Sequence, residues 1–223
     1  MKRIFLLLAI AMLALLSVAC ANDTTSNTTK QAPQIAAKTT YTNSLAGKKI
    51  LVAYFSATNN TKLVAEEIAQ ATRADIYRIE VAQSYSANPY DDKDRIQKEA
   101  YENLRPEVKA PLPASEMAKY DVIFVGSPIW WHQPAMVVCT FLESYDLSGK
   151  TVVPFFTYGA RSYLNESMQR IYKSTPNSVH VPASLPKDIE PDDIQQSQND
   201  DDGIIMPADV GNIDAWLKVL QLK

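Results

Sequence analysis

Short apolar runs alternate with stretches of helical spacing along most of the chain. The run Lys48 to Phe55, KKILVAYF, is rich in branched and aromatic residues and is long enough for a strand buried on both faces. Apolar side chains then recur at helical spacing over residues 61–72, and residues 74–81, ADIYRIEV, alternate like a strand. Strand, helix and strand in this order predict one right-handed crossover unit.

The same alternation continues towards the end of the chain. We expect a charged helix at Tyr90–Leu104, which Pro106 stops, and a second apolar strand at Tyr120–Gly126, after which a loop leads to a helix opened by Pro134. The later elements expected are a strand at Thr151–Phe156, a helix at Ser162–Tyr172, a short strand at Ser178–Val181 and a closing helix with Ile213, Trp216, Leu217 and Leu220 on one face. The pattern predicts an α/β fold, a doubly wound parallel sheet with helices on both faces.

In open sheets of this kind, ligands bind at the carboxyl ends of the strands, where the strand order reverses. The segments that follow Phe55, Gly126 and Phe156 are therefore the places where chemistry is expected. The first of them, Ser56-Ala57-Thr58-Asn59-Asn60-Thr61, offers three hydroxyls and two amides just before a helix. A helix start presents unpaired N–H groups and partial positive charge, so this loop suits a phosphate. The alternative is a plain capping loop, because Ser, Thr and Asn are also preferred N-cap residues.

The other two segments carry aromatic side chains. Ser127-Pro128-Ile129-Trp130-Trp131-His132 places two indoles and an imidazole past a buried strand, and Thr157-Tyr158-Gly159-Ala160-Arg161-Ser162 follows the next strand. The indoles either stack on a planar ring or cover the edge of the core. Together the three segments supply an anion site, a flat apolar wall and a backbone-lined turn, which suits a phosphorylated heteroaromatic ring.

These segments resemble the flavodoxin-like family, in its longer-chain branch. YFSATNNTKLVAEEIA is similar to the family's phosphate loop, GSPIWW to the loop along the isoalloxazine, and FFTYG to the third flavin loop. The resemblance runs from about Lys48 to Tyr172. It implies a five-stranded sheet of order 2-1-3-4-5 and flavin mononucleotide (FMN) as cofactor.

The resemblance assigns residues of this chain to three parts of the flavin. Ser56, Thr58, Asn59, Asn60 and Thr61 would hold the phosphate. Pro128, Ile129, Trp130 and Trp131 would form the ring wall and meet the pyrimidine edge, and Thr157, Tyr158 and Gly159 the remaining edge, with Trp131 and Tyr158 as the stacking residues. His132 would donate to a flavin carbonyl or a substrate, the alternative being a solvated loop histidine. Asn59, His132 and Ala160 stand where the family usually has small or glycine residues, and Arg161 replaces part of a Gly- and Ser-rich turn.

The first residues predict an export signal. Residues 1–19 join Lys2 and Arg3 to an apolar run too short to span a membrane, and Ser17-Val18-Ala19-Cys20 resembles a bacterial lipoprotein cleavage box in which Cys20 becomes lipidated. An ordinary signal peptide cleaved near Ala19 or Ala21 is the alternative. We expect a Thr-rich tether at 20–44, the flavodoxin-like domain at 45–223, and an extracytoplasmic location in a bacterial cell envelope, on a membrane to which the lipid anchors the chain.

Composition and charge limit the partners, nucleotide cofactors and metal sites that this chain is expected to have. Loss of residues 1–19 changes the formal net charge from −3 to −5, so nucleic acid is not an expected partner. No G-x-G-x-x-G or P-loop string occurs among the six glycines, which excludes the usual dinucleotide and P-loop signatures. Two histidines without paired cysteines do not predict a metal site, and Cys139 is expected to be a small core residue. The acidic stretch 187–202 is either a solvated insertion or a docking site for a basic redox partner.

Two hypotheses about function follow. The first is a lipid-anchored, FMN-binding flavoprotein that transfers electrons, as a carrier to a redox partner protein or as a reductase of small acceptors such as quinones. In that case the cofactor carries the redox step and no catalytic side chain is required. The second is a binding module that keeps the flavodoxin-like scaffold and has lost the flavin.

Overall fold

Apolar runs with branched side chains form the centre of a sheet, because extended backbone points successive side chains to opposite faces and helices cover both faces. A computed structural model of the chain describes residues 45–158, 163–181, 203–205 and 213–222. All of them belong to the compact unit Tyr41–Lys223. The other unit, Met1–Thr40, lies outside the described residues, as do the predicted signal peptide, Cys20 and the tether.

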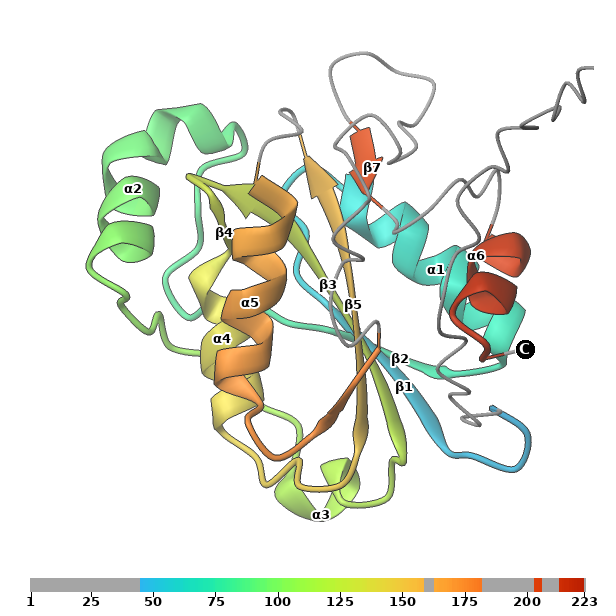
Figure 1. Ribbon diagram of the computed structural model, residues 1–223. Helices are drawn as coiled ribbons and strands as arrows, with labels where there is room; N and C mark the ends of the chain where they lie inside the picture. Colours follow the sequence, from blue (N-terminus) through green and yellow to red (C-terminus); the bar gives the residue numbers. More distant parts are fainter. Residues whose placement is uncertain (1–44, 159–162, 182–202, 206–212, 223) are drawn as a thin grey trace, which may run out of the picture. The chain divides into compact units, whose positions relative to one another are not determined.

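The sheet of the described chain has seven strands (Figure 1). They are β1 (Ile50–Tyr54), β2 (Asp75–Arg78), β3 (Val122–Trp130), β4 (Gln133–Pro134), β5 (Thr151–Tyr158), β6 (Val179–His180) and β7 (Gly203–Ile205). Five of them run parallel in the order β2-β1-β3-β5-β6. The other two are antiparallel additions, with β4 on β3 and β7 on β5.

The parallel α/β sheet is confirmed, and the two antiparallel strands β4 and β7 make it differ from the expected five-stranded sheet of order 2-1-3-4-5. The two added strands are two and three residues long, too short for an alternating pattern to show in the sequence. Both extend the sheet at the carboxyl ends of its central strands. The added strands therefore change the part of the fold in which the candidate site lies.

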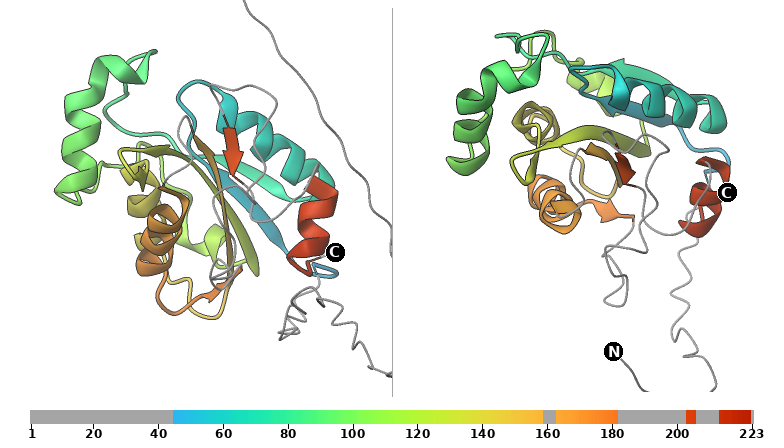
Figure 2. Two further views of the ribbon diagram at one scale, coloured as in Figure 1. Left: turned by 45° about the horizontal axis from the view of Figure 1, so that its top comes forward. Right: turned by 90° about the horizontal axis from the view of Figure 1, so that it is seen from above.

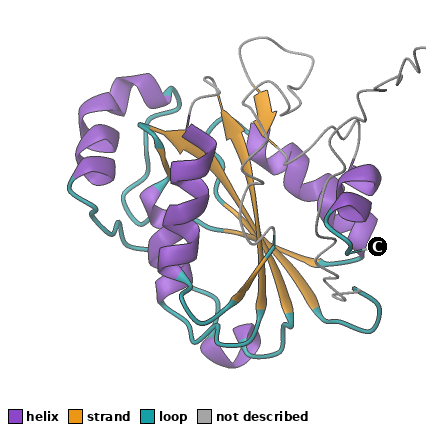
Figure 3. Cartoon of the chain, viewed as in Figure 1, coloured by secondary structure: helices purple, strands orange, loops and turns teal. Residues whose placement is uncertain are grey.

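The helices lie on both faces of the sheet (Figures 1 and 3). They are α1 (Asn60–Thr72), α2 (Lys93–Tyr101), α3 (Ala114–Met117), α4 (Met136–Glu143), α5 (Leu164–Ser174) and α6 (Ile213–Val219), with a 3₁₀ turn at Pro89–Asp92 before α2. Helices α4 and α5 cover one face and α1 and α6 the other, while α2 stands out to one side in all three views (Figures 1 and 2). None of the helices within the described ranges is long and apolar enough to cross a membrane.

Each face of the sheet has its own apolar core. Leu51, Ala53 and Phe55 of the first strand segment pack with residues of α4 and α5, whereas Ile50, Val52 and Tyr54 pack with α1 and α6. The alternation follows from the two-residue period of a strand. Cys139 is fully buried in α4, which confirms it as a core residue.

Several expected boundaries need correction. The helix expected at Tyr90–Leu104 is a 3₁₀ turn followed by α2, which ends at Tyr101. The helix expected to open at Pro134 begins at Met136, because Pro134 pairs with Ile129 in the β3–β4 ladder. The acidic stretch 187–202 lies outside the described residues.

Gly126 allows the two central strands to pack closely. It pairs with Phe155 in register, and a Cβ atom placed on it would lie 2.3 Å from Cζ of that ring. Any larger residue at this position would displace the Phe155 ring from the α1 side of the core. The sheet therefore needs a glycine at this point of β3.

Candidate functional site

The first loop leads from β1 to the N-terminus of α1. Asn59 is the N-cap and has left-handed backbone geometry, with φ 73° and ψ −2°, which Asn tolerates better than most residues. Its side chain makes no capping hydrogen bond, and the first turn of α1 contains no acidic residue. The unpaired N–H groups of that turn and its partial positive charge therefore meet no carboxylate from their own helix.

Ser56 is the least exposed hydroxyl of this loop after Thr61. Its side chain is 2% exposed, and Oγ has no hydrogen-bond partner among the described residues. A buried hydroxyl without a partner costs on the order of 1–3 kcal/mol relative to a satisfied one. An anion held at the loop would satisfy it. The loop thus contains one donor that the fold itself leaves unused.

Two of the predicted segments meet through a pair of buried hydroxyls. Oγ1 of Thr61 lies 2.7 Å from Oγ1 of Thr157, at hydrogen-bond distance. Thr157 also pairs in register with Pro128 of β3. The expectation that the three segments lie at neighbouring strand ends is confirmed, because β1, β3 and β5 are adjacent in the sheet. Thr58 and Asn59 are exposed and Asn60 is half-buried.

Sequence reasoning missed Arg78, the last residue of β2. Its Nη2 donates to the carbonyl oxygen of Ser56 over 3.0 Å, so a guanidinium lies directly against the first residue of the loop. The signal was present in the strand ADIYRIEV, whose only cation is Arg78, but strand order alone does not say how far a side chain reaches. Parallel pairing of β1 with β2 brings Arg78 level with Tyr54, two residues before Ser56.

A cavity of about 160 Å³ opens beside this contact. It is lined by Phe55–Ala57, Arg78–Val81, Ser84–Ala87 and Lys109. Two cations, one carboxylate and three serines therefore surround a space next to the first loop. Glu80 and Lys109, which both line it, form an ion pair with an N···O distance of 3.7 Å.

Helix α2 supports the far wall of this cavity. Tyr85 donates from its hydroxyl to Oε2 of Glu99 over 2.5 Å, and Arg95 donates to Oε1 of the same carboxylate over 2.8 Å. The Arg95 guanidinium also lies over the Tyr85 ring, 4.1 Å from its centroid. Burial, followed by the Glu99 carboxylate, raises the pKa of Tyr85, so its hydroxyl stays protonated and keeps donating.

The second segment is a hairpin and not the loop that was expected. Strand β3 continues through Ser127 to Trp130, and β4 returns antiparallel with Trp130 opposite Gln133. Trp131 and His132 form the two-residue turn, both with left-handed φ, at 47° and 68°. This corresponds to the type I′ turn of hairpins, which normally carries Asn-Gly. We name Trp131 and His132 the hairpin tip.

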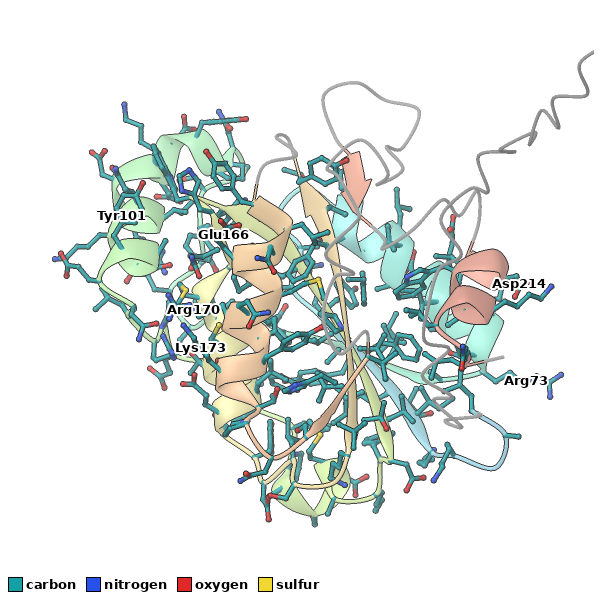
Figure 4. The ribbon with its side chains drawn as sticks, viewed as in Figure 1. Arg73, Tyr101, Glu166, Arg170, Lys173 and Asp214 are labelled. Atoms are coloured by element: carbon teal, nitrogen blue, oxygen red, sulfur yellow. The ribbon has the colours of Figure 1, made fainter. Side chains whose placement is uncertain are left out.

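The hairpin tip is held by side chains from two helices. The His132 ring stacks on Tyr163 with centroids 3.4 Å apart, and Tyr101 of α2 meets both tip residues edge-on. Arg170 of α5 donates from Nε to Oε1 of Gln133 over 2.8 Å (Figure 4 labels Arg170 and Tyr101). His132 is half-buried in this cluster and is not a fully solvated histidine.

The two indoles of this segment have different surroundings. Trp130 is half-buried and packs edge-on against Phe55 at 5.4 Å and Tyr85 at 5.1 Å, whereas Trp131 is 39% exposed. Pro128 and Ile129 are half-buried beside them. Trp130 thus covers the core edge, and Trp131 is the indole with free surface. Their assignment to a ring wall stays a prediction.

The third segment begins inside the sheet. Thr157 and Tyr158 are the last residues of β5 and not part of a loop, because β7 pairs with them as Thr157–Ile204 and Tyr158–Gly203. Tyr158 is only 4% exposed and belongs to the core on the α4 and α5 face. Its predicted stacking would need a ring face that this structure does not expose. Gly159, Ala160 and Arg161 lie outside the described residues.

The described part of the chain shows no group of three or more His, Cys, Asp or Glu side chains that could hold a metal ion. What it does show at the carboxyl edge of the sheet is a set of hydroxyl and guanidinium donors beside aromatic side chains. The family model for flavodoxin matches residues 49–197, which include every strand of the described sheet except β7. The chain belongs to the flavodoxin family.

Solved structures agree with this family assignment. A candidate flavoprotein from Bacteroides eggerthii is 31% identical, with a TM-score of 0.57, over 79% of this chain and 99% of that one. A candidate flavoprotein from Bacteroides uniformis is 33% identical, with a TM-score of 0.53, over 60% and 90% of the two chains. A Lactobacillus acidophilus flavoprotein in complex with FMN is 23% identical, with a TM-score of 0.51, over 60% and 90%, and shows the shared fold. No curated protein was found to match the sequence.

Proposed function

We propose that this flavodoxin-family chain is an FMN-binding flavoprotein that transfers electrons at a bacterial membrane. The observation that carries the proposal is the unpartnered, buried hydroxyl of Ser56 in the loop that leads to α1. Neither the loop Ser56–Thr61 nor the first turn of α1 carries an acidic residue, as a phosphate needs, and Asn59 supplies the left-handed turn. When bound, FMN would supply the reversible electron uptake and release.

The chain's own residues would bind and orient the cofactor. Ser56, Thr58, Asn60 and the backbone of the first turn of α1 would hold the phosphate, and Asn59 would shape the loop. The bond between Thr61 and Thr157 would keep this loop at a constant distance from the end of β5. Trp131, with its free surface, would provide the apolar wall of the flavin ring.

Titration of the apoprotein with FMN tests the proposal. The full chain, purified in detergent, is expected to be yellow and to quench FMN fluorescence on binding. Thr58→Val should weaken FMN binding about tenfold, since a hydrogen bond to a charged group is worth about 1.5–3 kcal/mol. Thr72→Val, at the opposite end of α1, is the matched control and should bind normally. A colourless chain that leaves FMN fluorescence unchanged would refute FMN binding.

A flavodoxin-like binding module without flavin is the second candidate. The burial of Tyr158 and the packing of Trp130 against Phe55 favour it, because both side chains were expected to meet the ring. The same titration separates the two candidates. Saturable quenching by FMN excludes the flavin-free module.

We further propose that Cys20 carries the lipid and that the acceptor is a redox partner protein or a small molecule such as a quinone. The cleavage box at residues 17–20 supports the anchor. Cys20→Ser is expected to release the protein from the membrane fraction without changing FMN binding. Reoxidation of the dithionite-reduced protein by a water-soluble quinone, followed by absorbance, tests the acceptor, and reoxidation no faster than in buffer would exclude a quinone.

A further inference from the structure

We propose that Arg78 is a phosphate-recognition residue, which makes the site select flavins that carry a 5′-phosphate over riboflavin. The proposal rests on the proposed FMN binding and adds a specificity determinant to it. Phosphate can be held at a helix N-terminus by hydroxyl and backbone donors alone. In this chain a fixed positive charge reaches the same loop from the neighbouring strand.

The position of Arg78 follows from the sheet. Parallel pairing of β1 and β2 sets Arg78 opposite Tyr54, so its side chain extends from the carboxyl end of β2 towards the start of the first loop. The guanidinium donates through Nη2 to the carbonyl oxygen of Ser56 over 3.0 Å. Ser56 is the residue whose buried Oγ lacks a partner. The guanidinium of Arg78 therefore contacts the same residue whose hydroxyl has no partner.

The charge of Arg78 is not neutralised by the described residues around it. No carboxylate among them lies within ion-pair distance of its guanidinium, and Glu80, the acidic residue that lines the same cavity, pairs with Lys109. The first turn of α1 adds no acidic residue either. One hydrogen bond accounts for one of the five N–H groups of the guanidinium, so others remain for a ligand.

A phosphate fits this arrangement better than a neutral ligand. Ser56 Oγ, the guanidinium and the helix N-terminus can all donate, and a phosphate offers several charged acceptor oxygens. Riboflavin has the same ring and side chain but ends in a hydroxyl, so it gains nothing from the charge of Arg78. The contribution of Arg78 therefore appears in the difference between the affinities of the two flavins.

The test compares FMN and riboflavin on the full chain in detergent, with dissociation constants from fluorescence quenching. Arg78→Gln is expected to weaken FMN binding about tenfold or more and to leave riboflavin binding within about twofold, as loss of a charge-assisted hydrogen bond predicts. Arg78→Lys keeps the positive charge and loses the planar guanidinium, so its affinity for FMN should lie between those of the native chain and Arg78→Gln. Added salt should weaken FMN binding to the native chain more than to Arg78→Gln.

Arg73→Gln is the matched control, because Arg73 is an exposed arginine at the other end of α1 (Figure 4). It should leave both affinities unchanged. If Arg78→Gln weakens FMN and riboflavin equally, or neither, Arg78 only holds the loop and the proposal is overturned. Should Arg78→Gln fail to fold, the ratio of the two affinities in Arg78→Lys decides the question: a fall supports recognition, and an unchanged ratio overturns it.

Inorganic phosphate separates this proposal from the proposed function. A native chain that binds neither flavin refutes FMN binding. Calorimetry then measures the binding of inorganic phosphate to that chain. If phosphate binds to the native chain and does not bind to Arg78→Gln, a phosphate site at Arg78 is still supported. Absence of phosphate binding in the native chain as well would overturn both proposals.

Discussion

The first loop turns on one left-handed residue, Asn59, whereas the hairpin tip turns on two, Trp131 and His132. Asn59 is exposed, and its side chain makes no capping bond, so the turn depends on the residue's own tolerance for positive φ. The tip residues are bulky and are held by Tyr163, Tyr101 and the bond from Arg170 to Gln133. The two regions lie at the same edge of the sheet, but local chemistry shapes the first and tertiary contacts shape the second.

The two regions also differ in how their serines are used. Ser127, fully buried at the base of the hairpin, accepts from the Ala135 N–H over 2.8 Å and donates to the Pro128 carbonyl oxygen. Ser56 at the start of the first loop is equally buried and has no partner among the described residues. Ser127 thus uses its hydroxyl to stabilise the fold, whereas the hydroxyl of Ser56 is left without a use in the fold. The comparison can be tested by changing each region in turn.

The largest effect is expected at Ser127. Ser127→Ala removes the shorter of two acceptors of the buried Ala135 N–H and should lower the free energy of unfolding by about 2 kcal/mol. Urea denaturation measures the change. Ser144→Ala, which loses an exposed hydroxyl bonded within α4 and its cap, is the control and should cost far less. Equal losses in the two variants would contradict a structural role for Ser127.

Arg170→Met is the next test. It removes the bonds from the guanidinium to Gln133 and Asn103, at 2.8 and 2.7 Å, and should lower the free energy of unfolding by about 1.5 kcal/mol. Lys173→Met, on the next turn of α5 and exposed, should change it little (Figure 4). If the Arg170 variant is as stable as the Lys173 variant, tertiary contacts are not what maintains the hairpin tip.

Relief of backbone strain at the hairpin tip should raise the free energy of unfolding. Trp131→Asn combined with His132→Gly places residues that favour positive φ in the type I′ turn. Relief of about 1–2 kcal/mol at each of the two residues exceeds the about 0.5–1.5 kcal/mol lost with the His132–Tyr163 stacking, so we expect a net gain of about 0.5 kcal/mol or more. Thermal unfolding measures it.

Asn59→Gly serves as the control for that exchange. Asn already tolerates the left-handed conformation, so the substitution should alter the free energy of unfolding by only a few tenths of a kcal/mol. A larger gain in the free energy of unfolding at Asn59 than at the hairpin tip would show that strain is concentrated in the first loop. That result would contradict the interpretation that local chemistry suffices to shape this loop.

The smallest effect on stability is expected at Ser56. Ser56→Ala removes a buried hydroxyl without a partner, so the free energy of unfolding should stay within about 0.5 kcal/mol or rise. Its effect should appear in FMN affinity, with a loss of about tenfold. A loss of stability as large as that of Ser127→Ala would show that the hydroxyl is used by the fold itself.

Much of the scaffold follows from the sequence because its signals are long and local. KKILVAYF and YDVIFVG contain the unbroken apolar stretches 50–54 and 122–126, which belong to the buried strands β1 and β3 side by side. The polar loop before α1 and the left-handed geometry of Asn59 are properties of a few adjacent residues. The hydrophobic pattern and the turn chemistry therefore suffice for the parallel α/β fold and for the place of the first loop.

The shape of the edge around that loop depends on contacts between distant residues. Strands β4 and β7 exist through pairing with β3 and β5, and this pairing holds Tyr158 within the sheet and moves Pro134 out of the helix expected there. Arg78 reaches Ser56 because β2 lies beside β1. Hydrophobic periodicity specifies which side chains face a core. The tertiary structure decided which polar and aromatic groups from different strands share one edge, because their proximity depends on where the strands end relative to one another.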